Sequence, residues 1–187
     1  MKRALILIVI IFTATGCHIF NIKTDRNPVN AKVNRIIDGD TITVDVTIGT
    51  KHYTDKKVRI MFIDTPEVHD NSHGKAMPEG ISATELLKKY LSHGDPVTLL
   101  NPSGKIQFDR YRRLLAIVVF NNTSIEDIII SEGYSVLWRK YGDPPEPYLS
   151  KWKKAEENSR LHKKGCWASA HGWMMLKLNE SRSNNIR

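Results

Sequence analysis

The stretch KVRIMFIDTPEV, from Lys57 to Val68, combines a core-strand pattern with charged residues at both of its ends. Its middle, Ile60 to Ile63, is an unbroken apolar run, which is typical of a strand buried on both faces. Arg59 stands immediately before this run, and Asp64 and Glu67 follow it around a proline. Charged groups at the ends of a buried strand need partners. The stretch therefore predicts a core strand with a candidate site beside it.

Regular strand geometry does not by itself bring Arg59 and Asp64 together. Side chains alternate between the two faces of a strand, so residues five apart point to opposite faces. Two alternatives remain open. Either the strand bulges or coils, as barrel strands often do, or the arginine reaches round a sheet edge.

Further strands and helices are predicted on both sides of this stretch. Residues 32–38 and 40–48 read as two strands around the turn dipeptide Asp38–Gly39, and residues 51–64 supply the third strand of a meander. A helix is predicted from Pro78 to Gly94, with an apolar face of Ile81, Leu86, Leu87, Tyr90 and Leu91. Later segments predict two strands near 96–101 and 113–120, a helix from Ser124 to Gly133 capped by Ser124 and Asp127, and a last helix that follows the prolines of 144–147 and ends at Gly165.

This order of strands and helices suits a small closed barrel of the OB type. We therefore predict an α+β fold, a five-stranded OB-fold barrel with three packed helices, in one domain over residues 31–169. Such barrels often bind nucleic acid strands. The 187-residue chain has a formal net charge of +8, which favours a polyanionic partner, either nucleic acid or an anionic membrane surface.

The acidic residues beside the turns predict a metal site. Asp40 and Asp64 each lie at a strand edge, and two close carboxylates favour a hard cation between them, with the carbonyl of Thr65 and waters completing its shell. Glu67 is placed to take a proton from a water near such an ion. Two arginines, Arg59 and a second one at position 113, have the forked geometry that grips phosphate oxygens. Each piece alone is also compatible with an ordinary turn or strand end.

The motifs together are more specific than any one of them. DGDT at 38–41, VRIMFIDTPE at 58–67 and FDRYRRLLA at 108–116 occur in an order that resembles the staphylococcal-nuclease-like family, the thermonucleases. MPEGISA at 77–83, SEGYSVLWRKY at 131–141 and KKGCW at 163–167 extend the resemblance over Lys32 to Trp167. Short motifs in the same order over such a length rarely recur by chance.

The resemblance implies an OB-fold enzyme that cleaves DNA and RNA with calcium and leaves 3′-phosphate ends. It implies single strands or frayed duplex as preferred substrates, and a monomer. The roles it implies are calcium carboxylates for Asp40 and Asp64, a carbonyl ligand for Thr65, a base or water-orienting group for Glu67, phosphate binding for Arg59 and Arg113, and substrate seating for Tyr111 and Tyr141.

One position departs from the family pattern, which commonly reads Asp-Lys-Tyr-Gly-Arg before the last core strand. Here Arg112 replaces the glycine, so an arginine is strained at this position if the backbone needs a positive φ. Because Leu114 and Leu115 follow as the family expects, we place the phosphate role on Arg113 rather than Arg112.

The N-terminus predicts export. Residues 1–16 have Lys2 and Arg3 before a nine-residue apolar run, which is typical of a signal peptide and too short to span a bilayer. ATGC at 14–17 resembles a lipoprotein cleavage motif, so we predict that Cys17 is lipidated and that 17–30 is a tether to the membrane. The alternative is ordinary signal-peptide cleavage, which leaves a secreted or periplasmic protein.

The rest of the sequence gives weaker signals. Cys166 is expected to be a small buried apolar residue, and the scattered histidines make no zinc spacing. In the tail at 170–187, residues 173–178 are expected to dock and 179–187 to be disordered, with no function assigned. Two other classes of protein stay open: a binding module that has lost catalysis and a surface adhesion lipoprotein. The first should lack one of the five charged candidates, and all five are present.

Overall fold

The computed structural model describes residues 28–69 and 75–184. The predicted signal peptide at 1–16 and Cys17 lie outside the described residues. The elements are β1 (Val29–Ile36), β2 (Thr41–Ile48), β3 (Lys51–Ile60), α1 (Pro78–Tyr90), β4 (Pro96–Leu100), β5 (Gln107–Phe108), β6 (Leu114–Phe120), β7 (Thr123–Ser124), α2 (Ile125–Ser131), α3 (Tyr148–Leu161), α4 (Cys166–Ser169) and α5 (His171–Asn184).

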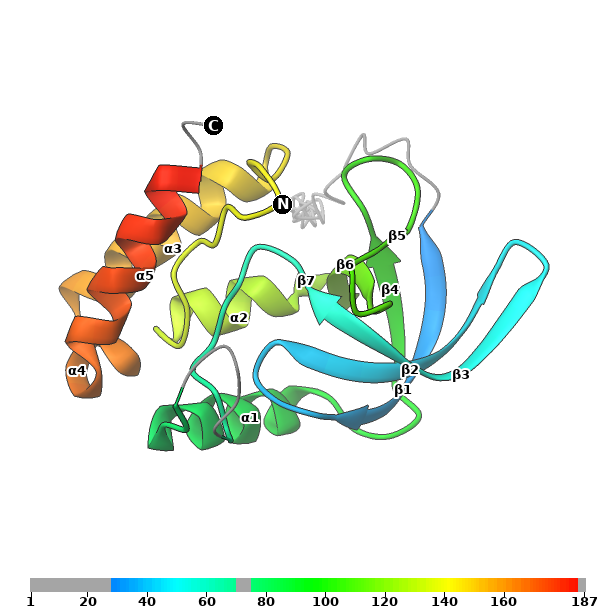
Figure 1. The fold of residues 1–187 in the computed structure, drawn as a ribbon, viewed down its shortest axis with the longest axis horizontal. Helices are drawn as coiled ribbons and strands as arrows, with labels where there is room; N and C mark the ends of the chain where they lie inside the picture. The colour runs from blue at the N-terminus through cyan, green and yellow to red at the C-terminus, as the bar shows by residue number, and fades with distance from the viewer. Residues whose placement is uncertain (1–27, 70–74, 185–187) are drawn as a thin grey trace, which may run out of the picture.

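Five strands form a closed barrel, as predicted. They lie in the order β3-β2-β1-β4-β6, and a parallel pairing of β3 with β6, from Val58 with Leu114 to Ile60 with Ala116, closes the circle. The two-residue strands β5 and β7 pair along β6. The helices lie below and to one side of the barrel, with α5 at the outer edge (Figure 1). The α+β prediction is confirmed.

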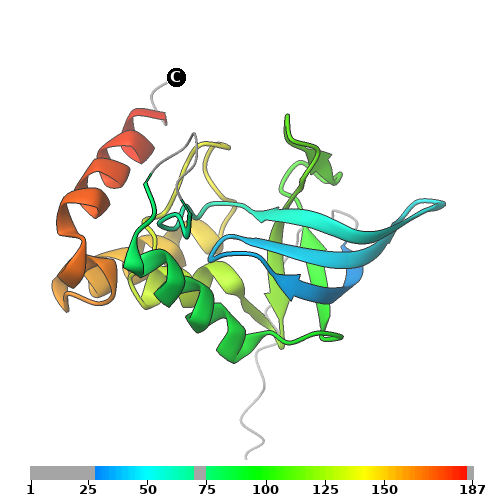
Figure 2. The same cartoon turned by 60° about the horizontal axis from the view of Figure 1, so that its bottom comes forward.

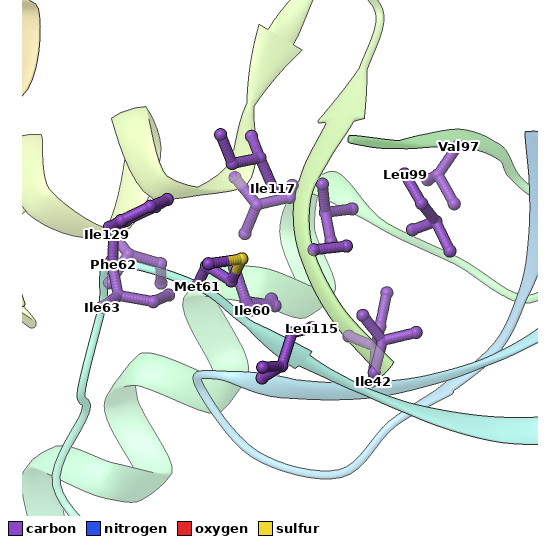
Figure 3. Packing of buried hydrophobic residues seen from close by; sticks show 14 of the residues in the cluster. Ile42, Ile60, Met61, Phe62, Ile63, Val97, Leu99, Leu115, Ile117 and Ile129 are labelled. Carbon is purple, nitrogen blue, oxygen red and sulfur yellow. The ribbon is translucent and has the colours of Figure 1, made fainter. Parts of the chain in front are cut away.

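Apolar side chains from every barrel strand fill the interior. Ile42, Val44 and Val46, which are alternate residues of β2, are buried. At the end of β3 the run Ile60 to Ile63 packs with Leu115 and Ile117 of β6 and with Ile129 of α2 (Figure 3). The core therefore continues from the barrel into the helical layer.

The third strand ends earlier than the sequence predicted. We expected it to reach Asp64, but β3 stops at Ile60 and a turn follows at Met61 and Phe62. Phe62 has a φ of +61°, in the left-handed region that non-glycine residues rarely adopt. Its side chain is nevertheless buried in the core, so packing offsets this conformational cost. The turn replaces strand alternation, and this answers how Arg59 and Asp64 can meet.

The three predicted helices are present with changed ends. Ser124 and Asp127 form the expected capping box of α2. Helix α1 ends at Tyr90 rather than Gly94, and its predicted apolar residues Ile81 and Tyr90 are exposed. Helix α3 ends at Leu161, before Gly165, which is instead the N-cap residue of the short α4.

The C-terminal segment is helical. Helix α5 buries Met174, Leu178 and Ser181, spaced by four and three residues along one face. Docking of 173–178 is thus confirmed, and the expectation of disorder is wrong as far as Asn184, the last residue described. Seen from a second side, α5 still forms the outer edge of the helical layer (Figure 2). Within the described ranges, no helix has the length and apolarity needed to cross a membrane.

Candidate active site

A cavity of about 560 Å³ opens where β3 ends. All eight residues that the sequence singled out for the domain line it: Asp40, Arg59, Asp64, Thr65, Glu67, Tyr111, Arg113 and Tyr141. They come from the turn before β2, the end of β3, the loop after β3, the loop before β6 and the segment before α3. The fold therefore brings residues up to 101 positions apart in sequence to the wall of a single cavity.

Arg59 joins the two carboxylates at the centre of this cavity. Its Nη1 lies 3.1 Å from Asp40 Oδ2, and its Nη2 lies 2.7 Å from Asp64 Oδ1. Nη1 also donates to the carbonyl of Ile60 at 2.8 Å. The arginine is 6% exposed. A buried guanidinium held by three acceptors presents a fixed positive charge at the site.

Backbone pairing explains how these groups are positioned. Thr41 of β2 pairs with Arg59 of β3, and the Ile60 N–H donates to the Asp40 carbonyl at 2.8 Å. On the other side, the Asp64 N–H donates to Ser135 Oγ at 2.8 Å. The loop after β3 is thus tied to the segment that carries Tyr141, so the site does not depend on β3 alone.

The environment of Asp40 disfavours the ionised form of its carboxyl group. Its Oδ2 accepts from the Thr65 N–H at 3.2 Å, and its Oδ1 accepts from Thr41 Oγ1 at 3.0 Å. The pKa of Asp40 is raised to about 7, chiefly by burial; Arg59 lowers it, and the carboxylates of Asp38 and Asp64 raise it. Burial therefore outweighs the stabilising effect of Arg59 on the ionised carboxylate.

The donor set fits a hard divalent cation such as calcium. Asp40 and Asp64 offer carboxylate oxygens, Thr65 brings its backbone alongside them, and this oxygen chemistry favours such an ion. Across residues 28–69 and 75–184, no group of three or more His, Cys, Asp or Glu side chains is arranged to hold a metal. Backbone carbonyls and water would have to supply the remaining ligands.

Asp109 organises the loop before β6. It accepts hydrogen bonds from the Tyr111 and Arg113 N–H groups, both at 2.9 Å, and from Arg113 Nε at 2.7 Å. Partial burial opposes its charge, yet these bonds from Arg113 and Tyr111 lower the pKa of Asp109. Between them, Arg112 has a φ of +61° and is exposed, which confirms that the position adopts the left-handed conformation. Of the two candidate arginines, Arg113 lines the cavity.

Glycine lets helix α1 approach the loop that carries Glu67. The Met77 N–H donates to the Glu67 carbonyl at 2.9 Å. A Cβ added to Gly80 would lie 2.5 Å from the same carbonyl oxygen, closer than side chains tolerate. The first turn of α1 therefore fixes the backbone of Glu67 at the rim of the cavity.

Helix α5 contributes residues to the cavity that the sequence did not predict. Lys177 Nζ lies 2.7 Å from Asp64 Oδ2, and Trp173 and Glu180 also line the cavity. Burial opposes the charge of Lys177, but the Asp64 and Glu180 carboxylates raise its pKa overall. Trp173, Lys177 and Glu180 are spaced by four and three residues, so a helical reading of the tail would have placed them on one face.

Cys166 behaves as predicted. It is fully buried, and burial raises the pKa of its thiol to about 12, which keeps it protonated and unreactive. Cys17, its proposed lipid and the tether up to residue 27 lie outside the described residues.

Comparisons with known proteins agree with this geometry. The model of the family described as "Staphylococcal nuclease homologue" matches residues 57–169, more than half of the 187-residue chain. A thermonuclease of Staphylococcus hyicus is 30% identical, with 78% of this chain and 80% of the relative covered. An uncharacterized protein of Bacillus anthracis is 34% identical over 75% of this chain and 61% of its own length.

Endonuclease YncB of Bacillus subtilis is 28% identical over 79% of this chain and 66% of its own length. The chain thus spans less than two thirds of two of these relatives. The family match covers the end of β3, the loop of Arg113 and helices α1 to α4, and the thermonuclease is matched over most of its own length. The chain belongs to the staphylococcal nuclease family.

Proposed function

We propose that the chain is a calcium-dependent endonuclease that hydrolyses phosphodiester bonds in DNA and RNA and leaves 3′-phosphate ends. The observation that carries this proposal is the convergence of Asp40, Arg59, Asp64, Glu67 and Arg113 on one cavity. A binding module without catalysis has no need for all five.

Each of these residues has a role that its position supports. Arg59 is fixed by two carboxylates and a carbonyl, so it can stabilise negative charge that develops on a phosphate. Arg113 is oriented by Asp109 and can bind a second phosphate oxygen. Tyr111 and Tyr141 line the same cavity and would seat the substrate.

Glu67 would accept a proton from the attacking water or orient that water. The backbone contacts of this residue hold it at the rim of the cavity that Asp40 and Asp64 also line. Asp40, Asp64 and the Thr65 carbonyl would hold the calcium ion, which when bound neutralises phosphate charge and polarises the substrate.

Export and anchoring form part of the same proposal. Signal peptide 1–16 would direct secretion, and a diacylated Cys17 would hold the domain at a membrane, since two acyl chains give stable attachment. If Cys17 is not lipidated, the enzyme would be secreted or periplasmic. We propose that it acts as a monomer on single strands or frayed duplex.

Activity in a DNA-containing gel tests the nuclease proposal directly. The renatured full chain should clear DNA in the presence of calcium and fail to do so with a chelator. An intact DNA background in both gels, with a thermonuclease control active beside it, would reject the enzyme in favour of a binding module.

A further inference from the structure

Lys177 of α5 places its ammonium group in the cavity, beside the carboxylate of Asp64. Its Nζ lies 2.7 Å from Asp64 Oδ2 and 3.4 Å from Glu180 Oε2. The rings of Trp138 and Trp173 face the ammonium, with centroids at 4.9 and 5.6 Å. The side chain is 19% exposed.

Helix α5 is fixed in place beside the cavity. Ser181 Oγ donates to the Leu137 carbonyl at 2.6 Å and accepts from the Arg139 N–H at 3.1 Å. Met174 and Leu178 pack with Trp167 in a buried cluster. These hydrogen bonds and apolar contacts fix the position of α5, and therefore the position of Lys177 relative to Asp64.

Both carboxylate oxygens of Asp64 are already engaged. Arg59 holds Oδ1 and Lys177 holds Oδ2. A metal ion bound by Asp64 must displace one of them. Arg59 is buried and also holds Asp40 and the Ile60 carbonyl, whereas Lys177 has a long flexible stem and a second acceptor in Glu180. Displacing Lys177 from Asp64 therefore costs less free energy than displacing Arg59.

We propose that Lys177 is an internal competitor for the calcium position at Asp64, so that α5 sets the calcium concentration at which the site fills. This rests on the proposed function in assigning Asp64 to calcium. When the ion binds, the ammonium moves toward Glu180 and stays between the two tryptophan rings.

Calcium titration of the full chain without substrate tests the competition. Lys177→Met should lower the calcium Kd roughly tenfold, as expected for removal of one charge-assisted contact. The matched control is Lys140→Met, because Lys140 lines the same cavity and its loss changes the net charge equally. Equal effects of the two substitutions, or an unchanged Kd in Lys177→Met, would overturn the proposal.

A double-mutant cycle with Glu180 separates competition from a simple field effect. Glu180→Gln removes the alternative acceptor, so it should weaken calcium binding in the wild type and weaken it much less in Lys177→Met. Equal weakening in both backgrounds would overturn the proposal. Calcium binding by neither background would overturn it too, while the gel assay judges the nuclease proposal separately.

A second, separate feature is a patch of lysines and aromatic rings beside the β2–β3 hairpin, formed by Lys51, Tyr53, Lys56 and Phe108. Lys56 Nζ lies 5.5 Å from the Tyr53 ring centroid and 5.2 Å from that of Phe108, and the two rings are 6.4 Å apart. Lys51 lies 5.0 Å from Tyr53. Phe108 is 46% exposed.

The hairpin patch is close in sequence to a residue that lines the cavity. Phe108 is three residues from Tyr111, which lines the cavity. Two of the nearby carboxylates have arginine partners, Asp55 with Arg35 and Asp109 with Arg113, each at 2.7 Å. The exposed Phe108 ring and the partly exposed Tyr53 ring, set among cations, match the stacked bases and phosphates of a single nucleic acid strand.

We infer that the hairpin patch binds the substrate strand beyond the nucleotides held in the cavity. This deepens the proposed function by naming a second subsite for a single strand. Its occupant is recognised by stacking and charge, without sequence preference.

Binding to strands of two lengths tests this subsite. With calcium and a Glu67→Gln background to prevent cleavage, Phe108→Ala should raise the Kd for a strand of about 12 nucleotides roughly tenfold. It should leave a dinucleotide unaffected. Tyr90→Ala, at an exposed ring on α1, is the matched control.

Lys56→Gln should act in the same direction as Phe108→Ala. An unchanged Kd for the longer strand in both variants, or equal losses for both lengths, would overturn the subsite. Activity of the wild type in the DNA gel would be unaffected by that outcome, so the two proposals fail separately.

Discussion

At the scale of single residues, the site depends on groups whose partners are fixed before any substrate arrives. Arg59 is held by Asp40 and Asp64, and Arg113 by Asp109. Such fixed charges need little reorganisation when phosphate charge develops. The residue with the chemical step assigned to it, Glu67, lies at the rim of the same cavity.

Glu67→Gln should fold normally and lose most activity. The amide keeps the shape of the side chain but cannot accept the proton, and general-base contributions are typically about 10²–10⁴-fold. The rate of DNA cleavage by the purified variant measures the effect. Asp95→Asn, at a carboxylate that does not line the cavity, serves as control. A variant rate within a few-fold of wild type would remove Glu67 from the chemistry.

Arg112→Gly should stabilise the protein. The position has a φ of +61°, which costs a non-glycine residue about 1 kcal/mol or more. Glycine relieves this strain, so the free energy of unfolding measured with denaturant should rise by about 1 kcal/mol. Arg112→Ala keeps the strain and should not gain stability. Equal gains in both variants would place the cost in the arginine side chain instead.

At the scale of elements, the turn that ends β3 decides the site. The apolar run predicted a core segment, and Ile60 to Ile63 are indeed buried. The sequence did not show that the strand stops at Ile60, because Phe62 takes a positive φ that only tertiary packing makes tolerable. Tertiary context thus overrode local preference where the charged residues had to meet.

Some features of the helices could also be predicted from the sequence, and others could not. The capping box of α2 was predictable because its signal is local. The alignment of Lys177 with Asp64 was not, since it requires knowing where α5 docks. The 3.6-residue periodicity of Met174, Leu178 and Ser181 was nevertheless available in the sequence. All eight predicted site residues line one cavity. They could be predicted because the family resemblance carries long-range information that periodicity lacks.

Helix α2 also carries a buried carboxylate outside the site. Glu126 is fully buried, and neither of its side-chain oxygens has a hydrogen-bond partner among the described residues. Burial, together with the neighbouring Asp127 carboxylate, raises the pKa of Glu126 well above its usual 4.5. The folded state therefore favours the protonated acid.

Stability should consequently fall as pH rises above the unfolded pKa of Glu126, near 4.5. Unfolding then releases a proton, and the free energy of unfolding drops by about 1.4 kcal/mol per pH unit until the folded pKa is reached. Glu126→Gln should remove this slope and raise the melting temperature at pH 8 but not at pH 4. Glu157→Gln, at an exposed glutamate, should change neither. A parallel shift at both pH values would contradict a buried neutral acid.

At the scale of the whole molecule, the proposal places a basic nuclease domain on a tether. Cys17→Ser should separate anchoring from catalysis, because it removes the lipid attachment point and leaves the domain untouched. The wild type should fractionate with membranes and incorporate labelled fatty acid. The variant should remain as precursor or be released, with its specific activity retained. A soluble, unlabelled wild type would indicate an ordinary signal peptide.

Calcium should stabilise the whole fold, since the ion binds only where Asp40 and Asp64 are brought together. The melting temperature of the wild type should rise with calcium concentration, and Asp40→Ala should weaken that shift. Asp95→Asn is again the control. The same calcium-induced shift in Asp40→Ala as in the wild type would remove Asp40 from the metal site.

The most direct test of the nuclease proposal is cleavage of an end-labelled single-stranded DNA by the purified chain, with the product ends identified. We expect cleavage with calcium, loss of cleavage on chelation, recovery when calcium is restored in excess, and products that carry 3′-phosphates. Cleavage that persists in chelator, or no cleavage in any calcium concentration by a folded protein, would contradict it.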